Sequence, residues 1–422
     1  MNNSSTSRRF IGLIAIACAA STTLAASGAA PAPQPVSPSG APGQAASRLD
    51  KDIAQKGRAM MAKAIAWLRT QQDEKSGGWA INPDAKAMQF PAITGLVVNG
   101  MLLDPSITRD DPAVAKGVKY ILSMQQPDGG IYDRQLQSYN TAICISALTR
   151  AGGDEAHAAA DKALKFLRTL QYGEDAMEGG KETMRVTRDH PFYGGVGYGG
   201  GGRPDNSNLN FFLTALQDAG VDCKDPAVQR AMVFLSRTQM LGTVNDQDYA
   251  KGSKQGGFIY ATSPNKDNVG RGESKADTIE ETMDDGTKVS RLRAYGSMTY
   301  AGFKSYLYAQ LPRDDERVKA AYDWIKHNYT LDENPGAGVH GMYYFYVTFS
   351  RAMDALGEPS LVAAPPESTE AKERFWAVDL INKLSTLQNE DGSFKSLDNR
   401  WMENNPVLIT AYSVIALGHA AE

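Results

Sequence analysis

Three ionisable side chains in this sequence are of types that move protons: Asp205, His340 and Glu403. A carboxyl or imidazole group held beside a substrate can act as a general acid or base. They are the candidate catalytic residues, and the sequence assigns no definite role to any of them. Catalytic zinc takes three suitable protein ligands, and the five His and three Cys residues show no such spacing. We therefore predict no metal site and no cofactor.

A second set of side chains could bind a ligand without reacting with it. Aromatic rings suit an isoprenoid chain or a carbocation through apolar contact and cation–π attraction. They suit stacking on a sugar ring equally well, or simple packing between helices. The candidate binding residues combine such rings with amides: Tyr139, Asn140, Asn208, Tyr295, Tyr343, Tyr344 and Trp401.

Composition narrows the class of protein. The chain has 422 residues, of which 42% are hydrophobic, so wholesale disorder is excluded. Lys and Arg number 44 against 48 Asp and Glu, giving a formal charge of −4. There is no long basic run, which argues against nucleic acid as a partner.

The N-terminus has the order of a secretory signal peptide. Arg8 and Arg9 precede an apolar run over 10–20, and small residues follow as far as Ala30. We expect a signal peptide over 1–30, a flexible Pro/Ala/Gly-rich linker over 31–47, and a periplasmic or extracellular protein. No transmembrane segment is expected in the mature chain. Two alternatives stay open, twin-arginine export and a lipid anchor at Cys18.

Internal repeats account for the rest, 48–422. A helical row recurs six times, with apolar residues at one position, four on and seven on. Five copies place a glutamine eleven on: Gln72, Gln125, Gln171, Gln239 and Gln388. Five carry an aromatic just before the third apolar position: Trp67, Tyr120, Phe166, Phe234 and Trp324.

A glycine turn and a second, more apolar helix follow each row. Six such pairs predict an all-α double ring, with amphipathic helices outside and apolar helices inside. An open superhelix is the structural alternative. Cys144 falls in an apolar helix and Cys223 in a loop, so no disulfide is expected.

These residues resemble a known family. The stretch from Lys116 through Gln125 and Gly130 to Tyr132 is similar to the QW motif of squalene and oxidosqualene cyclases, and 67–79 and 384–394 are related copies. The resemblance to the prenyltransferase and squalene-cyclase repeat superfamily implies an (α/α)6 toroid. It also implies a site at the N-terminal ends of the inner helices, which is where the candidate residues fall. If the protein is an enzyme, the resemblance implies a transferase or a cyclase-like isomerase.

The chemistry of the family is not evident in the sequence. No Asp-x-Asp-Asp acid motif is present, and the nearest aspartates, Asp111, Asp225 and Asp315, precede outer helices as N-caps. The Asp/Cys/His zinc set of the prenyltransferases is also missing. The favoured hypothesis is therefore an exported toroid that holds a small apolar or isoprenoid-type ligand, with catalysis undecided.

Two other functions stay open at this point. A carbohydrate-active lyase or hydrolase would use a pair of carboxyls from Asp133, Asp205, Asp398 and Glu403. A non-catalytic interaction scaffold is the third hypothesis. Two long polar segments, 172–193 and 261–294, interrupt the repeats and are expected on the face where the cavity opens.

Overall fold

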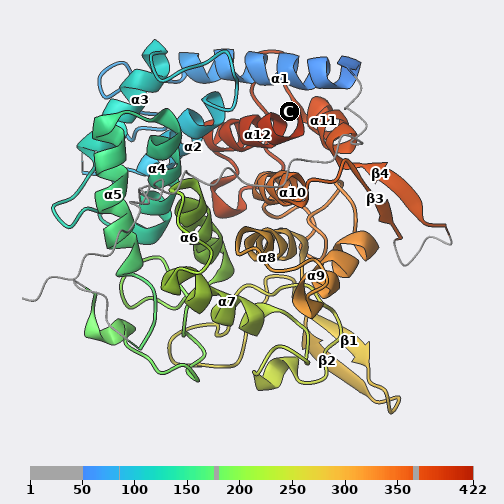
Figure 1. Cartoon of the computed structure of the whole chain (residues 1–422). Helices are drawn as coiled ribbons and strands as arrows, with labels where there is room; N and C mark the ends of the chain where they lie inside the picture. The colour runs from blue at the N-terminus through green and yellow to red at the C-terminus, as the bar shows by residue number, and fades with distance from the viewer. Residues whose placement is uncertain (1–50, 85, 175–179, 365–369, 422) are drawn as a thin grey trace, which may run out of the picture. The chain divides into compact units, whose positions relative to one another are not determined.

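The computed structural model describes residues 51–84, 86–174, 180–364 and 370–421. The predicted signal peptide, the linker and Cys18 lie outside the described residues. The described part of the chain contains twelve α-helices, which alternate between two rings (Figure 1).

The inner ring is built from the apolar helices. In α2 every residue from Pro91 to Met101 is buried, because neighbours cover it on all sides. Each inner helix packs against the next, and α12 packs against α2, so the ring closes (Figure 1). The inner helices are α2 (Pro91–Met101), α4 (Gln137–Ala151), α6 (Asn206–Asp218), α8 (Gly296–Tyr308), α10 (Met342–Leu356) and α12 (Pro406–Ala420).

The outer helices bury one face against this ring. Asp111, Asp225 and Asp315 each accept a backbone N–H from the first turn of the helix they precede, as an N-cap does. The predicted toroid is confirmed, and the open superhelix is excluded. The outer helices are α1 (Lys51–Thr70), α3 (Pro112–Ser123), α5 (Asp154–Arg168), α7 (Pro226–Thr238), α9 (Glu316–His327) and α11 (Trp376–Leu387).

The repeated glutamine joins one repeat to the next. Gln72 Nε2 donates to the carbonyl oxygen of Gly77 in its own turn, at 2.8 Å, and to that of Ala113 in α3, at 2.9 Å. Gln388 does the same from the last repeat to the first, donating to Met60 of α1 at 2.9 Å. The amide thus reaches forward to the next outer helix.

The glycine turn and the aromatic residue form a steric pair. A Cβ on Gly130 would lie 2.6 Å from the ring of Phe166 in the next outer helix, and one on Gly195 would lie 2.6 Å from Phe234. Only glycine admits the ring at that distance. The motif is therefore a joint between repeats rather than part of a reaction site.

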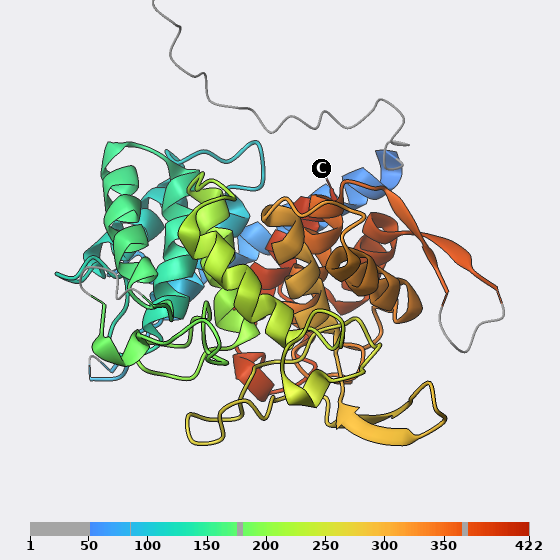
Figure 2. The ribbon, with the colours of Figure 1, turned by 60° about the horizontal axis from the view of Figure 1, so that its bottom comes forward.

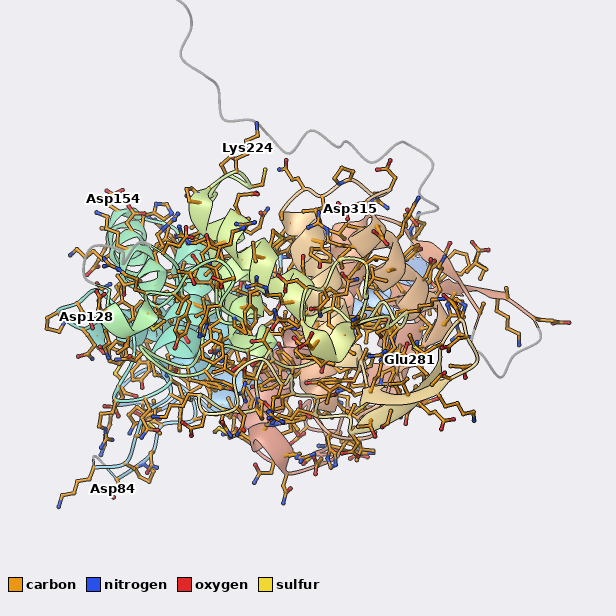
Figure 3. All side chains as sticks on the ribbon, turned by 90° about the horizontal axis from the view of Figure 1, so that it is seen from below. Asp84, Asp128, Asp154, Lys224, Glu281 and Asp315 are labelled. Atoms are coloured by element: carbon orange, nitrogen blue, oxygen red, sulfur yellow. The ribbon has the colours of Figure 1, made fainter. Side chains whose placement is uncertain are left out.

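The connecting loops fall on two faces. Asp154, Lys224 and Asp315 lie in or beside loops that lead from an inner to an outer helix, and Figure 3 shows them along one edge. Asp84, from a loop that leads to an inner helix, lies at the opposite edge (Figure 3).

Two antiparallel hairpins were not expected from the sequence. Segment 261–294, predicted as a polar loop, contains β1 (Thr278–Thr282) paired with β2 (Lys288–Leu292), which projects from the ring in Figure 2. β3 (Ser360–Ala363) pairs with β4 (Lys372–Phe375) ahead of α11. No helix within the described ranges is long and apolar enough to cross a membrane.

Candidate functional site

A cavity of ≈ 320 Å³ lies at the N-terminal ends of the inner helices. All six inner helices contribute to its wall, because the closed ring points their first turns at a common centre. The helices supply Ala92, Ile93, Leu96, Tyr139, Asn140, Ser207, Ser297, Met298, Tyr344, Leu408 and Tyr412. The loops before them supply Phe90, Leu136, Tyr198, Tyr260, Tyr295, Trp401, Met402 and Glu403.

Six tyrosines line this wall, and most of their hydroxyls are bonded to one another or to an amide. Tyr139 Oη and Tyr412 Oη lie 3.0 Å apart, and Asn210 Nδ2 donates to Tyr344 Oη at 3.2 Å. Burial raises the pKa of the Tyr412 hydroxyl, so it stays neutral at physiological pH. The wall therefore presents rings and uncharged hydroxyls to an occupant.

Glu403 is the single carboxylate that lines the cavity within the described part of the chain. Its side chain accepts the backbone N–H of Tyr344 at 2.9 Å and that of Tyr343 at 3.2 Å, so it caps the start of α10. Burial raises the pKa of Glu403 to about 7, although the two N–H groups favour its charged form.

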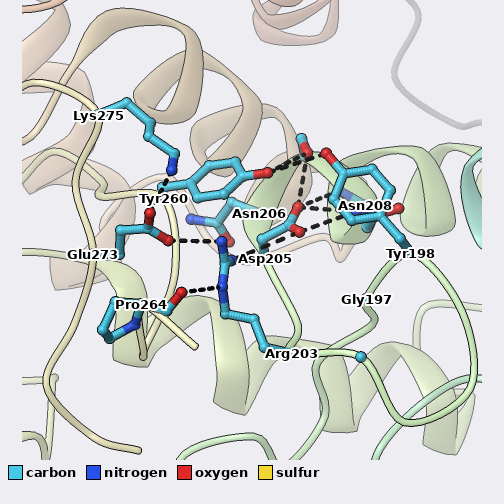
Figure 4. Close-up of polar contacts among 12 residues, drawn as sticks. Gly197, Tyr198, Arg203, Asp205, Asn206, Asn208, Tyr260, Pro264, Glu273 and Lys275 are labelled. Carbon is cyan, nitrogen blue, oxygen red and sulfur yellow. Dashed lines mark hydrogen bonds and ion pairs between the residues drawn. The ribbon is translucent and has the colours of Figure 1, made fainter. Parts of the chain in front are cut away.

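Asp205 does not line the cavity. It is fully buried as the N-cap of α6 and accepts the backbone N–H of Asn208 at 3.0 Å. Burial raises the pKa of Asp205, while its hydrogen bonds and the nearby Arg203 oppose the shift. Figure 4 shows Asp205 beside Arg203, which is ion-paired with Glu273.

His340 also lies outside the cavity wall. Its Nδ1 is 2.7 Å from Asp398 Oδ2, and this hydrogen bond lowers the pKa of the Asp398 carboxyl. The pair joins the loop before α10 to the segment that carries Trp401 and Glu403 to the cavity.

The structure divides the predicted binding residues. Tyr139, Asn140, Tyr295, Tyr344 and Trp401 line the cavity. Asn208 and Tyr343 do not.

Both absent residues are used elsewhere. Asn208 Nδ2 donates to Asp205, and the Tyr343 hydroxyl donates to the carbonyl oxygen of Lys395. On a helix, adjacent residues point about 100° apart, so Ser207 and Tyr344 face the cavity where their neighbours do not.

Three tyrosines of the wall were missed in the sequence. Tyr198 lies in the glycine-rich run 194–202, Tyr260 follows the Gly256-Gly257 turn, and Tyr412 is inside α12. Tyr412 occupies the position in α12 that Ile143 occupies in α4. This tyrosine in place of an aliphatic residue was the signal in the sequence that could have identified it.

The backbone at the mouth carries strain. Leu136, Trp401 and Met402 have φ values of 53°, 54° and 66°. Non-glycine residues in this region cost of order 1–3 kcal/mol each and cluster at functional sites. All three line the cavity, whereas Ala80, Asp277 and Gln310, the other described non-glycine residues with positive φ, do not.

Comparisons with known proteins agree with the fold. Residues 83–262 match the model of the squalene-hopene cyclase C-terminal domain. This confirms, over that part of the chain, the resemblance to the squalene-cyclase and prenyltransferase superfamily. A comparison with curated protein sequences gives no significant match.

Solved structures with the same architecture include an α-1,6-mannanase, GH76A of Salegentibacter sp. HEL1_6, at 9% identity and a TM-score of 0.53, covering 87% of this chain and 99% of that one. The type II terpene cyclase MstE from Scytonema, in a variant bound to geranylgeranyl dihydroxybenzoate, aligns at 12% identity and a TM-score of 0.48, covering 88% and 99%. The mannanase likeness supports the α/α toroid and carries no activity to this chain.

Proposed function

We propose that this protein holds an apolar, isoprenoid-type ligand in its central cavity. The observation that carries the proposal is the composition of the wall: aliphatic side chains, aromatic rings and mutually bonded hydroxyls, with one carboxylate. Contact between such a surface and a hydrocarbon ligand is favourable, because apolar area on both sides is removed from water. The surface offers few hydrogen-bonding groups to a polar ligand. The cavity volume of ≈ 320 Å³ is at the lower end of the range of about 300–1,000 Å³ for ligand sites.

The same wall argues against acid-initiated cyclisation. Protonating a carbon–carbon double bond takes a strong, well-placed acid. Burial raises the pKa of Glu403 to about 7, which makes this carboxyl a weaker acid than an ordinary one. The proposal is therefore ligand binding, with no acid step assigned.

Carbohydrate hydrolysis fits the geometry less well, because it takes two carboxyls facing one substrate. Of the four sequence candidates, Asp133 is paired with Arg134, Asp205 is buried behind the wall and Asp398 is bonded to His340. Glu403 alone faces the cavity.

Two experiments test the proposal. Organic extracts of the purified protein, analysed by mass spectrometry, are expected to contain a stoichiometric apolar compound. Calorimetric titration with farnesol is expected to show saturable binding that Ala92→Phe abolishes, since Ala92 lines the cavity and a phenyl ring would fill it. Ala115→Phe, on the exposed side of α3, is the matched control. No extracted compound and no binding of farnesol by the unmodified protein would refute the proposal.

We also propose that the chain is exported by its first 30 residues. The support is the Arg8-Arg9 pair, the apolar run after it and the small residues up to Ala30. N-terminal sequencing of protein expressed from the full chain tests this, with a start between Ala25 and Ala30 expected. An unprocessed N-terminus would contradict it.

A further inference from the structure

A line of three hydroxyl groups, those of Tyr198, Tyr260 and Ser207, runs from the cavity wall to the buried carboxylate of Asp205. We call this line the relay. Tyr198, Tyr260 and Ser207 all line the cavity. Tyr198 Oη lies 3.2 Å from Tyr260 Oη, which lies 3.4 Å from Ser207 Oγ, and Ser207 donates to Asp205 Oδ1 at 2.7 Å. Figure 4 shows the hydroxyl groups of Tyr198 and Tyr260 close together, with Asp205 beside them.

The direction of the line is set by Asp205. Its two oxygens accept from Ser207 Oγ, from the backbone N–H of Asn208 at 3.0 Å and from the Asn208 amide at 3.0 and 3.1 Å. Arg203 Nη1 lies 3.8 Å away as an ion-pair partner. While Asp205 is ionised it only accepts hydrogen bonds, so the one proton of Ser207 is committed to it.

The remaining protons follow from that commitment. Ser207 Oγ can enter a second hydrogen bond only as an acceptor, so Tyr260 donates to it. Tyr260 then has no proton left for Tyr198, and the 3.2 Å contact is a hydrogen bond only if Tyr198 donates. One arrangement alone makes both contacts hydrogen bonds, and in it every proton points away from the mouth.

The ring of Tyr260 is fixed in place by charge. The guanidinium carbon of Arg203 lies 5.0 Å from the ring centroid and Lys275 Nζ lies 4.9 Å from it. Both cations are bound to the carboxylate of Glu273 (Figure 4). These contacts therefore hold the Tyr260 ring, and with it the position of Oη, between Tyr198 and Ser207.

The consequence falls on Tyr198 at the mouth, where this residue is 40% exposed. Its proton is used by Tyr260, and the one proton of Ser207, the other hydroxyl near it, is committed to Asp205. Tyr198 Oη thus presents lone pairs only, and a group that bonds to it must bring a proton.

We propose that the cavity selects apolar ligands that end in a hydroxyl group, with Tyr198 Oη accepting the hydroxyl proton and the relay to Asp205 fixing that polarity. This inference rests on the proposed function and names the ligand class for the same site. A carboxylate or an ether end brings acceptors alone to Tyr198 and gains nothing there. The ligand is accordingly an alcohol of isoprenoid type, oriented with its tail among the tyrosine rings.

The test compares two ligands that differ by one proton donor. Dissociation constants for farnesol and for its methyl ether are measured by calorimetry on the full chain and on Tyr198→Phe, Ser207→Ala and Tyr322→Phe. The unmodified protein is expected to prefer the alcohol roughly 3- to 10-fold, the value of one net hydrogen bond. Tyr198→Phe and Ser207→Ala are expected to bind both compounds within about 2-fold.

Ser207→Ala distinguishes the relay from a direct contact between the ligand and Tyr198 alone. It leaves the Tyr198 hydroxyl in place but removes the connection to Asp205 that fixes the direction of its proton. Tyr322→Phe removes a hydroxyl from an outer helix and should keep the preference; circular dichroism confirms that each variant is folded. Equal binding of alcohol and ether by the unmodified protein overturns the inference while the proposed function stands. A full preference in Ser207→Ala overturns the relay. If neither compound binds, the proposed function fails and this inference with it.

Discussion

Replacing Gln239 by leucine tests whether the repeated glutamine holds the ring together. Gln239 is fully buried, and its Nε2 donates to the carbonyl oxygens of Gly256 at 2.8 Å and Arg317 at 2.9 Å. Its Oε1 accepts the hydroxyl of Tyr306 at 3.0 Å. Leucine is of similar size, so the change removes three hydrogen bonds and leaves little cavity.

The loss can be sized from these contacts. At about 1 kcal/mol net per hydrogen bond, the free energy of unfolding falls by about 3 kcal/mol. It falls by up to ~5 kcal/mol if the buried Tyr306 hydroxyl and the two carbonyls find no other partner. Urea unfolding followed by tryptophan fluorescence measures the change.

The control is Gln229→Leu in α7, the helix for which Gln239 is the C-cap residue, because Gln229 is exposed. We expect it to shift the free energy by no more than ~0.5 kcal/mol. If the two variants unfold within about 1 kcal/mol of each other, the glutamine is not the joint between repeats.

Two further predictions concern packing and pH. Gly195→Ala places a methyl group 2.5 Å from Pro204 and 2.6 Å from the Phe234 ring. We expect it to lower the melting temperature, at a cost in stability of about 1–3 kcal/mol. The control Gly202→Ala meets no atom closer than 3.5 Å and should leave the melting temperature unchanged. The pKa of Glu403 is raised from 4.5 to about 7, so the folded state binds the proton more tightly than the unfolded one, and stability is lost as the pH rises through that window. Glu403→Gln should therefore flatten the unfolding free energy between pH 5 and pH 8, by an amount on the order of 3 kcal/mol; a variant with the same pH profile as the unmodified protein would contradict this.

The architecture could be predicted because the same pattern, an amphipathic helix, a glycine turn and an apolar helix, recurs six times in the sequence. Gln72, Gln125, Gln171, Gln239 and Gln388 recur at one offset from an apolar row, and the structure gives all five the same pair of carbonyl acceptors. Ring closure follows from the same pattern, since Gln388 finds in α1 the acceptor that the others find one repeat on.

The β1–β2 hairpin was missed although a signal was present. Asp285-Gly286 is a favoured hairpin turn, and Gly286 has a φ of 83°. The strands around it are mostly polar and exposed, so no alternating apolar pattern announced them. Their pairing comes from the turn and from cross-strand contacts such as Lys288 with Glu280 rather than from burial.

The site could be predicted as a region and not residue by residue. The repeat pattern correctly places Asn208 and Tyr343 at the starts of inner helices. The rotation of each helix about its axis, however, decides which side chain faces the cavity. In α6 that residue is Ser207, and in α10 it is Tyr344. Helix rotation depends on packing against both neighbours in the ring, which no single repeat contains.

The carboxylates at the inner-helix starts were misleading for a physical reason. The first turn of a helix leaves backbone N–H groups without partners, and in a toroid these groups point at the same space as the ligand. Asp205 and Glu403 are bound to such N–H groups at α6 and α10, as Asn405 is at α12. Carboxylate and amide side chains at this end thus bind the first N–H groups of the helices, whereas the tyrosine hydroxyls of the wall, such as those of Tyr198 and Tyr295, do not. A site of this kind is better sought among hydroxyl groups than among the acids beside them.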